Sequence, residues 1–252
     1  MKHIAMVSGG RDSTAMVEKM LQEGRDLDYI IFTDTEQEFG FMYEYLDKFN
    51  DRLKSVYGKE ITYLKPKSKF EDWAFGKVTR GDRKGMTRGL PMITVVCYWK
   101  RESKVYPFDR FIKENNITEY TQYIGYTYSE RKRAVVKDTR QSFPLIDYKM
   151  CEADVDRLLE SIDMVNPLYN HFSRTGCAMC PYQSERSMYT LWKNYKDTWE
   201  YMKTIENKLL NMDSVVNKTW KIGVTIQELE DSFIENKKSF SDVPDKACEC
   251  AI

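Results

Sequence analysis

The residues with the clearest chemical meaning are SGGRDST, Ser8 to Thr14. They follow directly on a short apolar run, His3 to Val7, which predicts a buried strand that stops at a glycine turn. Apolar residues then recur at helical spacing, so the stretch reads as a strand, a tight turn and the start of a helix. The unpaired N–H groups of a helix N-terminus, with glycines that let a ligand approach the backbone, form a site for phosphate.

The side chains in this stretch would complete such a site. Hydroxyl groups add hydrogen-bond donors, and the carboxylate of Asp12 makes chemical sense if a divalent cation accompanies the phosphates. The alternative is an ordinary strand-to-helix turn with Ser and Asp as caps. We expect a catalytic role for Asp12 and phosphate contacts from Ser8, Gly9, Gly10, Arg11, Ser13 and Thr14.

The sequence SGGRDS resembles the PP-loop of the adenine nucleotide alpha hydrolase-like superfamily, whose pattern is SGGxDS. Its members include ATP pyrophosphatases and the phosphoadenosine phosphosulfate (PAPS) reductase family. The resemblance implies an adenosine nucleotide, either ATP or the sulfonucleotides PAPS and APS, together with Mg²⁺. The motif alone does not choose the reaction.

A second apolar strand, Leu27 to Asp34, ends on polar residues. Ligands of open parallel sheets bind outside the carboxyl ends of the strands, so we expect Asp34, Thr35 and Glu38 beside the PP-loop. FTDTEQEF resembles the DTGxEF segment of the PAPS reductase family, with Glu36 at the usual glycine position. Alternatively, Asp34 and Thr35 only cap the next helix.

A further strand is predicted from Gln122 to Tyr126, and TYSERKRA follows it. Gly125, Glu130 and Arg133 match a G-x(4)-E-x-x-R element of sulfonucleotide reductases and adenylyltransferases. The resemblance implies that this arginine reaches the anionic part of the nucleotide. Otherwise Glu130 and Arg133 form a surface ion pair worth about 0.3 kcal/mol.

The segment RTGCAMCP carries Cys177 and Cys180 in a C-x-x-C pair, introduced by Arg174. Two thiolates at this spacing can bind one metal centre. The segment is close to the R-x-GCxxC signature of the PAPS reductase family, which implies that Arg174 helps to hold the nucleotide.

The six cysteines are irregularly spaced, which favours thiols, a metal or redox chemistry over structural disulfides. A [4Fe-4S] cluster needs four thiolates, and Cys97, Cys177 and Cys180 supply three. Cys151, a tail cysteine or an open coordination position would complete the set. Zinc would need four Cys or His ligands, and the sequence has only two histidines. We favour an iron-sulfur cluster over zinc, and both over a free redox dithiol.

The last residues, SDVPDKACECAI, contain Cys248 and Cys250. A cysteine tail resembles the C-terminal segment of sulfonucleotide reductases, where a cysteine attacks the sulfur of the nucleotide. The resemblance implies a catalytic role for Cys248 or Cys250. A frayed end with surface thiols, or a donated cluster ligand, is the alternative.

The elements that must position these residues alternate strands and helices. We therefore expect an α/β fold with a doubly wound parallel sheet over residues 1–165, followed by a helical region over 166–252 that bears the C-x-x-C pair. The aromatic and charged pattern from Glu185 to Leu210 predicts one long helix. The resemblance places Cys97 in a helix preceded by Pro91.

Composition sets further limits. The 252 residues carry 39 basic and 39 acidic side chains, so no global charge attracts the chain to nucleic acid or membrane. No apolar run approaches membrane-spanning length, and the first strand begins without a signal peptide, so we expect a cytoplasmic protein without a membrane partner. The oligomeric state is left open.

Together these segments resemble a cluster-bearing member of the PAPS reductase family. Two chemistries fit: reduction of a sulfonucleotide with a thiol redox partner, or adenylation by an ATP pyrophosphatase, followed by transfer from a sulfur donor. The second reaction would take a nucleic acid or a small molecule as substrate. A nucleotide- or redox-sensing module without catalysis is the third hypothesis.

Overall fold

The computed structural model describes residues 1–93, 96–134, 139–235 and 240. Five strands form a central sheet in the order β3-β2-β1-β7-β8, and every neighbouring pair is parallel. The order reverses between β1 and β7, and ligands of such sheets bind at this switch point. The five strands are β1 (Lys2–Val7), β2 (Tyr29–Thr33), β3 (Ile61–Leu64), β7 (Tyr120–Tyr123) and β8 (Gln141–Ser142).

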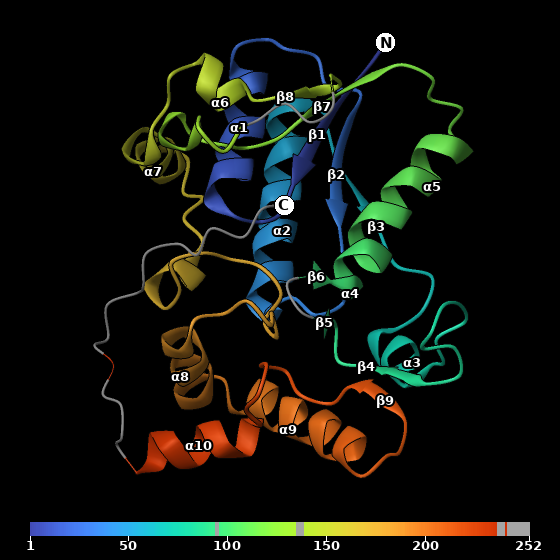
Figure 1. The fold of residues 1–252 in the computed structure, drawn as a ribbon. Helices are drawn as coiled ribbons and strands as arrows, with labels where there is room; N and C mark the ends of the chain where they lie inside the picture. Colours follow the sequence, from blue (N-terminus) through green and yellow to red (C-terminus); the bar gives the residue numbers. More distant parts are fainter. Residues whose placement is uncertain (94–95, 135–138, 236–239, 241–252) are drawn as a thin grey trace.

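Helices cover both faces of the sheet (Figure 1). Ala5 of β1 belongs to the large apolar core that includes α1 (Arg11–Gln22) and α2 (Gly40–Arg52). Its neighbour Ile4 belongs to a smaller core on the other face, with α5 (Tyr106–Glu114). Successive strand residues point to opposite faces, so both faces of β1 are buried. The predicted doubly wound parallel sheet is confirmed.

The remaining elements connect the strands or follow them. They are η1 (Leu53–Tyr57), α3 (Phe70–Phe75), β4 (Thr87–Gly89), β5 (Met92–Ile93), β6 (Val96–Cys97), α4 (Tyr98–Lys100), η2 (Arg101–Val105), η3 (Tyr128–Glu130), α6 (Pro144–Asp147), α7 (Glu152–Ser161), η4 (Pro167–Asn170), α8 (Glu185–Asn194), α9 (Lys196–Leu210), β9 (Val215–Asn217) and α10 (Ile226–Ile234).

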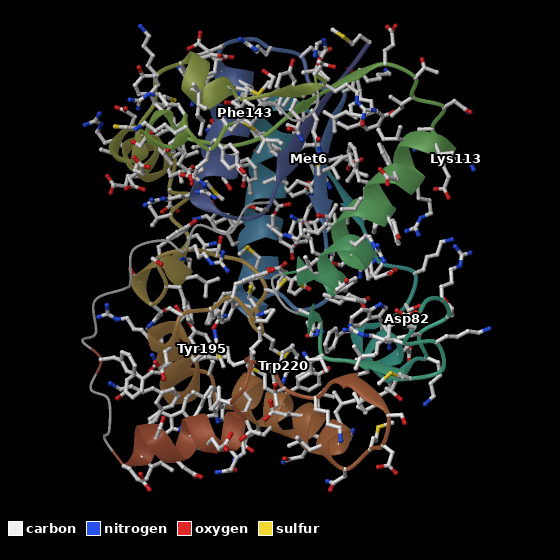
Figure 2. The ribbon with its side chains drawn as sticks, in the orientation of Figure 1. Met6, Asp82, Lys113, Phe143, Tyr195 and Trp220 are labelled. Carbon is white, nitrogen blue, oxygen red and sulfur yellow. The ribbon has the colours of Figure 1, made fainter. Side chains whose placement is uncertain are left out.

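The C-terminal helices α8, α9 and α10 lie beyond the carboxyl ends of β1 and β2 (Figure 1). The predicted helical C-terminal region is therefore present. Figure 2 shows Trp220 among the side chains of this region, and its ring stacks on Phe70 at 5.7 Å. One apolar core runs from the sheet into these helices. The boundary between residues 165 and 166 stays a prediction.

The single helix predicted from Glu185 to Leu210 is wrong. Helix α8 ends at Asn194, α9 begins at Lys196, and Tyr195 between them has φ −129° and ψ 61°. The ring of Tyr195 packs against Phe39 at 5.1 Å and Phe172 at 5.6 Å. The residue at the break is therefore itself part of an aromatic cluster, and the apolar pattern of the sequence continues through it.

Among the described helices, none is long and apolar enough to cross a membrane.

Candidate functional site

The PP-loop turns sharply because its glycines fit where no side chain would. Gly9 has φ +73°, and a Cβ at this position would lie 2.0 Å from the sulfur of Met42. Gly125, just after β7, would place a Cβ 2.8 Å from the Cα of Ser13. The loops that follow β1 and β7 are therefore packed against each other at the switch point, and helix α1 begins there.

Three N–H groups of the PP-loop donate to hydroxyl oxygens of the protein. The N–H of Ser8 donates to Ser13 Oγ at 3.0 Å, and the N–H of Gly10 donates to Ser8 Oγ at 3.4 Å. The N–H of Arg11 donates to the phenol oxygen of Tyr169 at 3.1 Å. Neutral hydroxyl oxygens thus occupy the positions next to the backbone where an anion would accept.

The hydroxyl groups of Ser13 and Thr14 both donate to the carbonyl of Gly10, each at 3.0 Å. Both side chains are buried. In this state they shape the turn, and direct contact of these hydroxyls with a nucleotide stays a prediction.

Asp12 is the unusual carboxyl of the PP-loop. Burial raises its pKa to about 7, repulsion from Glu130, Glu152 and Asp156 adds to the effect, and Arg11 opposes it. Asp12 Oδ1 is buried and accepts no hydrogen bond, although Arg11 Nε lies 3.5 Å away. A buried carboxylate oxygen without a hydrogen-bond partner can bind a cation or a proton.

Glu130 and Arg133 follow β7 as expected and form an ion pair with each other. The guanidinium of Arg133 also lies over the ring of Tyr126, 5.4 Å from its centroid. The structure therefore shows the ion pair that was the simpler alternative, and contact of Arg133 with a nucleotide stays a prediction.

The carboxyl end of β2 places Asp34 in a buried polar setting, with 3% of its surface exposed. Asp34 Oδ1 accepts from the hydroxyl of Tyr43 and the N–H of Glu36, each at 2.8 Å, and Lys65 lies 3.7 Å from Oδ2. Glu36 itself has φ +56°, so it adopts the left-handed conformation expected of glycine here. A cavity of about 500 Å³ opens beside Asp34, bordered also by Lys69, Phe70 and Tyr201.

Thr35 and Glu38 lie against the C-x-x-C pair. The thiol of Cys177 donates to Thr35 Oγ1 at 3.3 Å, and Thr35 donates to Glu38 Oε1 at 2.8 Å. Burial raises the pKa of Glu38, an effect that Lys104 opposes, and Glu38 Oε2 is buried without a hydrogen-bond partner. Burial also raises the pKa of Cys177, with Glu38 the next contribution.

Cys180 and Cys97 belong to the same region. Arg174 donates to the sulfur of Cys180 at 3.3 Å. Burial raises the pKa of Cys97, and the charge of Cys180 contributes in the same direction. The expected helical position of Cys97 is wrong: Cys97 ends β6, pairs with Met92 of β5, and is the residue before α4.

Cys151 lies apart from these thiols, at the start of α7, where its thiol donates to Asp154 at 3.1 Å. Figure 1 shows α7 and β6 well separated. Cys248 and Cys250 lie outside the described residues. Within the described part of the chain, no three His, Cys, Asp or Glu side chains are placed to hold a metal ion. The thiols suit a cluster chemically, but their present placement does not form one, and the ligand set stays a prediction.

Three residues at the site could not be found from sequence: Asn166, Tyr169 and Thr175. The amide of Asn166 donates to the carbonyl of Gly9 at 2.8 Å across 157 residues. The Asn-Pro pair at this point predicts only a turn. Nothing local indicates that the turn lies on the PP-loop.

Comparisons with known proteins identify the family to which the chain is similar. Residues 2–183 match the family of the phosphoadenosine phosphosulfate reductase domain. An uncharacterized protein of Methanocaldococcus jannaschii is 28% identical over 179 residues, which are 69% of this chain and 40% of the relative. The match therefore spans less than half of that relative's length.

Two solved structures are similar to the chain at low identity. A PAPS reductase from Candida auris, solved as a phosphate complex, is 16% identical, with a TM-score of 0.45 over 67% of this chain and 76% of that one. The U34-tRNA thiolase NcsA from Methanococcus maripaludis, solved with its 4Fe-4S cluster, is 15% identical, with a TM-score of 0.43 over 92% of this chain and 80% of that one.

Proposed function

The chain belongs to the phosphoadenosine phosphosulfate reductase domain family, and we propose that it is an enzyme that binds an adenosine nucleotide at the PP-loop and performs sulfur chemistry beside it. Mg²⁺ would accompany the nucleotide. The C-x-x-C pair, whose Cys177 contacts Thr35 just after β2, would be the sulfur-handling group.

Asp12 carries this proposal. It stands in the first turn of α1, where the helix dipole attracts phosphate, and one of its oxygens is buried without a hydrogen-bond partner. A carboxylate at this position repels a bare phosphate chain. Asp12 would be a ligand of Mg²⁺, and the charge of the cation would offset that repulsion.

ATP-dependent sulfur transfer is the reaction that this arrangement favours. A substrate oxygen attacks the α-phosphorus of ATP, the bond to the β-phosphate oxygen breaks, and pyrophosphate leaves. A sulfur nucleophile then attacks the activated carbon, and AMP leaves with the oxygen. The PP-loop and Arg11 would hold the phosphates. A sulfane-sulfur donor would leave a persulfide on Cys177 or Cys180, and the outer sulfur would attack the activated carbon of a nucleic acid or a small molecule. The other cysteine thiol would then break the S–S bond, leaving the sulfur on the substrate and a disulfide that a thiol partner reduces.

Sulfonucleotide reduction is the second candidate, and the contact between Arg174 and Cys180 favours it. A guanidinium suits sulfate because its fork donates two hydrogen bonds. A thiolate, from Cys248 or Cys250, would attack the sulfur of PAPS or APS, breaking its bond to the phosphate oxygen and forming a thiosulfonate. A thiol partner would then release sulfite and leave a disulfide, so the two thiols supply the electrons.

An iron-sulfur cluster remains part of this proposal, with Cys97, Cys177 and Cys180 as the thiolates that would hold it. Such a cluster supplies either electrons or an open metal position that binds sulfur. Thr35 and Arg174 would first have to release the two thiols that they now contact.

Incubation of anaerobically purified protein separates these functions. Release of pyrophosphate from ATP, in the presence of Mg²⁺ and a substrate that accepts sulfur, supports sulfur transfer. Release of sulfite from PAPS in the presence of a dithiol supports reduction. Tight binding of either nucleotide without turnover supports a sensing module. Failure to bind any adenosine nucleotide would contradict the proposal.

A further inference from the structure

We propose that the hydroxyl of Tyr169 competes with a phosphate oxygen for the N–H of Arg11 in the PP-loop, so that Tyr169 sets the affinity of this site for nucleotides. This inference rests on the proposed function, because it concerns the same site. It assigns a role to a residue that lies 158 positions from its partner in the chain.

The phenol oxygen of Tyr169 accepts a hydrogen bond from the PP-loop. The donor is the N–H of Arg11 at 3.1 Å, in the first turn of α1. Phosphate oxygens are bound in the same way, by a backbone N–H of a helix N-terminus. The phenol thus satisfies a donor that an anion would otherwise satisfy.

The hydroxyl groups of Tyr169 and Thr175 both lie in the space over Gly10. A Cβ on Gly10 would lie 2.9 Å from Thr175 Oγ1 and 3.3 Å from the phenol oxygen of Tyr169. The absence of a side chain at Gly10 is what lets these oxygens approach the turn. A ligand oxygen that reaches the N–H of Arg11 must displace the phenol.

Charge decides which ligands can displace it. The guanidinium of Arg11 lies over the ring of Tyr169, 5.2 Å from the centroid, where it gains only a weak cation-π attraction. A phosphate in place of the phenol would gain a charge-assisted hydrogen bond, the helix dipole and the full charge of Arg11. A neutral ligand would gain none of these, so the exchange favours polyanions.

A hydrogen bond from Asn166 to the PP-loop fixes the segment that carries Tyr169. Asn166 begins the short helix η4 (Pro167–Asn170) that carries Tyr169, and its amide donates to the carbonyl of Gly9 at 2.8 Å. Burial raises the pKa of Tyr169, so its hydroxyl stays protonated near neutral pH. The competitor is therefore neutral and fixed at the loop.

Calorimetric titration of the whole protein with ATP and Mg²⁺, and with pyrophosphate and Mg²⁺, tests this inference. Tyr169→Phe keeps the ring and removes the competing oxygen, and we expect about fivefold tighter binding of both ligands, the value of one net hydrogen bond. Thr175→Val removes the second hydroxyl at nearly constant volume and should change binding in the same direction. Tyr120→Phe is the matched control, because that ring also lies beside an arginine, Arg140 at 4.8 Å, but at the amino end of β7.

The outcomes separate this inference from the proposed function. If the unmodified protein binds the ligands and neither Tyr169→Phe nor Thr175→Val binds them more tightly, Tyr169 is no competitor and the inference fails alone. If no variant and no unmodified protein binds either ligand, both the inference and the nucleotide site are wrong. Should Tyr169→Phe not fold, Thr175→Val decides.

Discussion

The thiol of Cys177 lies 3.3 Å from the hydroxyl oxygen of Thr35, although 142 residues separate them in the chain. A second contact supports the first, because the N–H of Ala178 donates to the carbonyl of Gln37 at 2.7 Å. These bonds fasten the C-x-x-C pair to the carboxyl end of β2. The thiols and the PP-loop therefore share one edge of the sheet, where ligands of this fold class bind.

Replacement of Asp12 tests its role in catalysis. We expect Asp12→Ala to lower nucleotide turnover on the order of a hundredfold or more, because the variant lacks the carboxylate that would bind Mg²⁺. The fold should persist, since the side chain of Asp12 is partly exposed and only its Oδ1 is fully buried. Steady-state pyrophosphate release measures the first effect and circular dichroism the second. Full activity in the variant would remove Asp12 from the mechanism.

The raised pKa of Asp12 also predicts a pH dependence of binding. Mg²⁺ requires the ionised carboxylate, so the affinity for ATP with Mg²⁺ should rise as the pH increases through about 7. Binding below that pH should release up to one proton, which calorimetry in buffers of different ionisation enthalpy detects. Asp12→Asn should show neither effect. An equal pH dependence in the variant would assign the titration to another group.

The same carboxyl predicts how stability depends on pH. Its pKa rises from an ordinary 3.8 to about 7 on folding, so between these values the folded protein binds more protons than the unfolded chain. The stability that Asp12 contributes is therefore lost as the pH rises through about 7. Denaturant unfolding at pH 6 and pH 8 should show a loss of about 1.4 kcal/mol that Asp12→Asn does not share. An identical loss in both proteins would contradict this assignment.

Gly125 should not tolerate a side chain. A Cβ there would lie 2.8 Å from both the N and the Cα of Ser13, so Gly125→Ala must push α1 away from β7. We expect a loss of stability on the order of 2 kcal/mol and at least tenfold weaker nucleotide binding. Gly40→Ala is the control, since nothing lies within 4 Å of a Cβ at that helical position. Equal behaviour of the two variants would show that the switch point is not tightly packed.

The cysteine variants test the cluster. After anaerobic purification we expect a brown protein that contains iron and absorbs at roughly 400 nm. Cys177→Ser should lose both the colour and the iron. Cys151→Ser should keep both signals, because Cys151 contacts Asp154 on α7 instead of the other thiols. Loss of colour in Cys151→Ser would instead make Cys151 the fourth ligand. A colourless, iron-free protein would remove the cluster from the account.

Glu36 offers a test of backbone strain. A side chain at φ +56° is disfavoured, so Glu36→Gly should raise the free energy of unfolding by up to about 1 kcal/mol. Glu36→Ala removes the same carboxylate but keeps a Cβ, so it should bring no such gain. Denaturant unfolding of both variants makes the comparison. An equal gain in both variants would point to charge instead of conformation.

The sequence alone predicted those elements of the fold that are determined by residues close together in the chain. The strand, glycine turn and helix around Ser8 to Thr14 follow from a few consecutive residues, and the structure contains all three. The apolar faces of β1 and β2 likewise predicted a parallel sheet buried on both sides. Burial and backbone geometry act at short range here, so neighbouring residues carry the information.

Contacts between distant segments could not be predicted. The break at Tyr195 has no Gly or Pro signal, and the aromatic pattern continues across it, so periodicity indicated one helix. Tyr169 reaches Arg11 only because the chain returns to the PP-loop after α7. The orphaned oxygen of Asp12 depends on burial by several elements together. Each of these features is set by tertiary packing.

A crystal structure of the protein with a non-hydrolysable ATP analogue and Mg²⁺ tests the central claim most directly. We predict phosphate oxygens within hydrogen-bond distance of the N–H groups of Gly10 and Arg11, Mg²⁺ on Asp12, and the phenol of Tyr169 displaced. A nucleotide bound elsewhere, with these N–H groups still donating to Ser8 and Tyr169, would contradict the nucleotide site proposed for this chain.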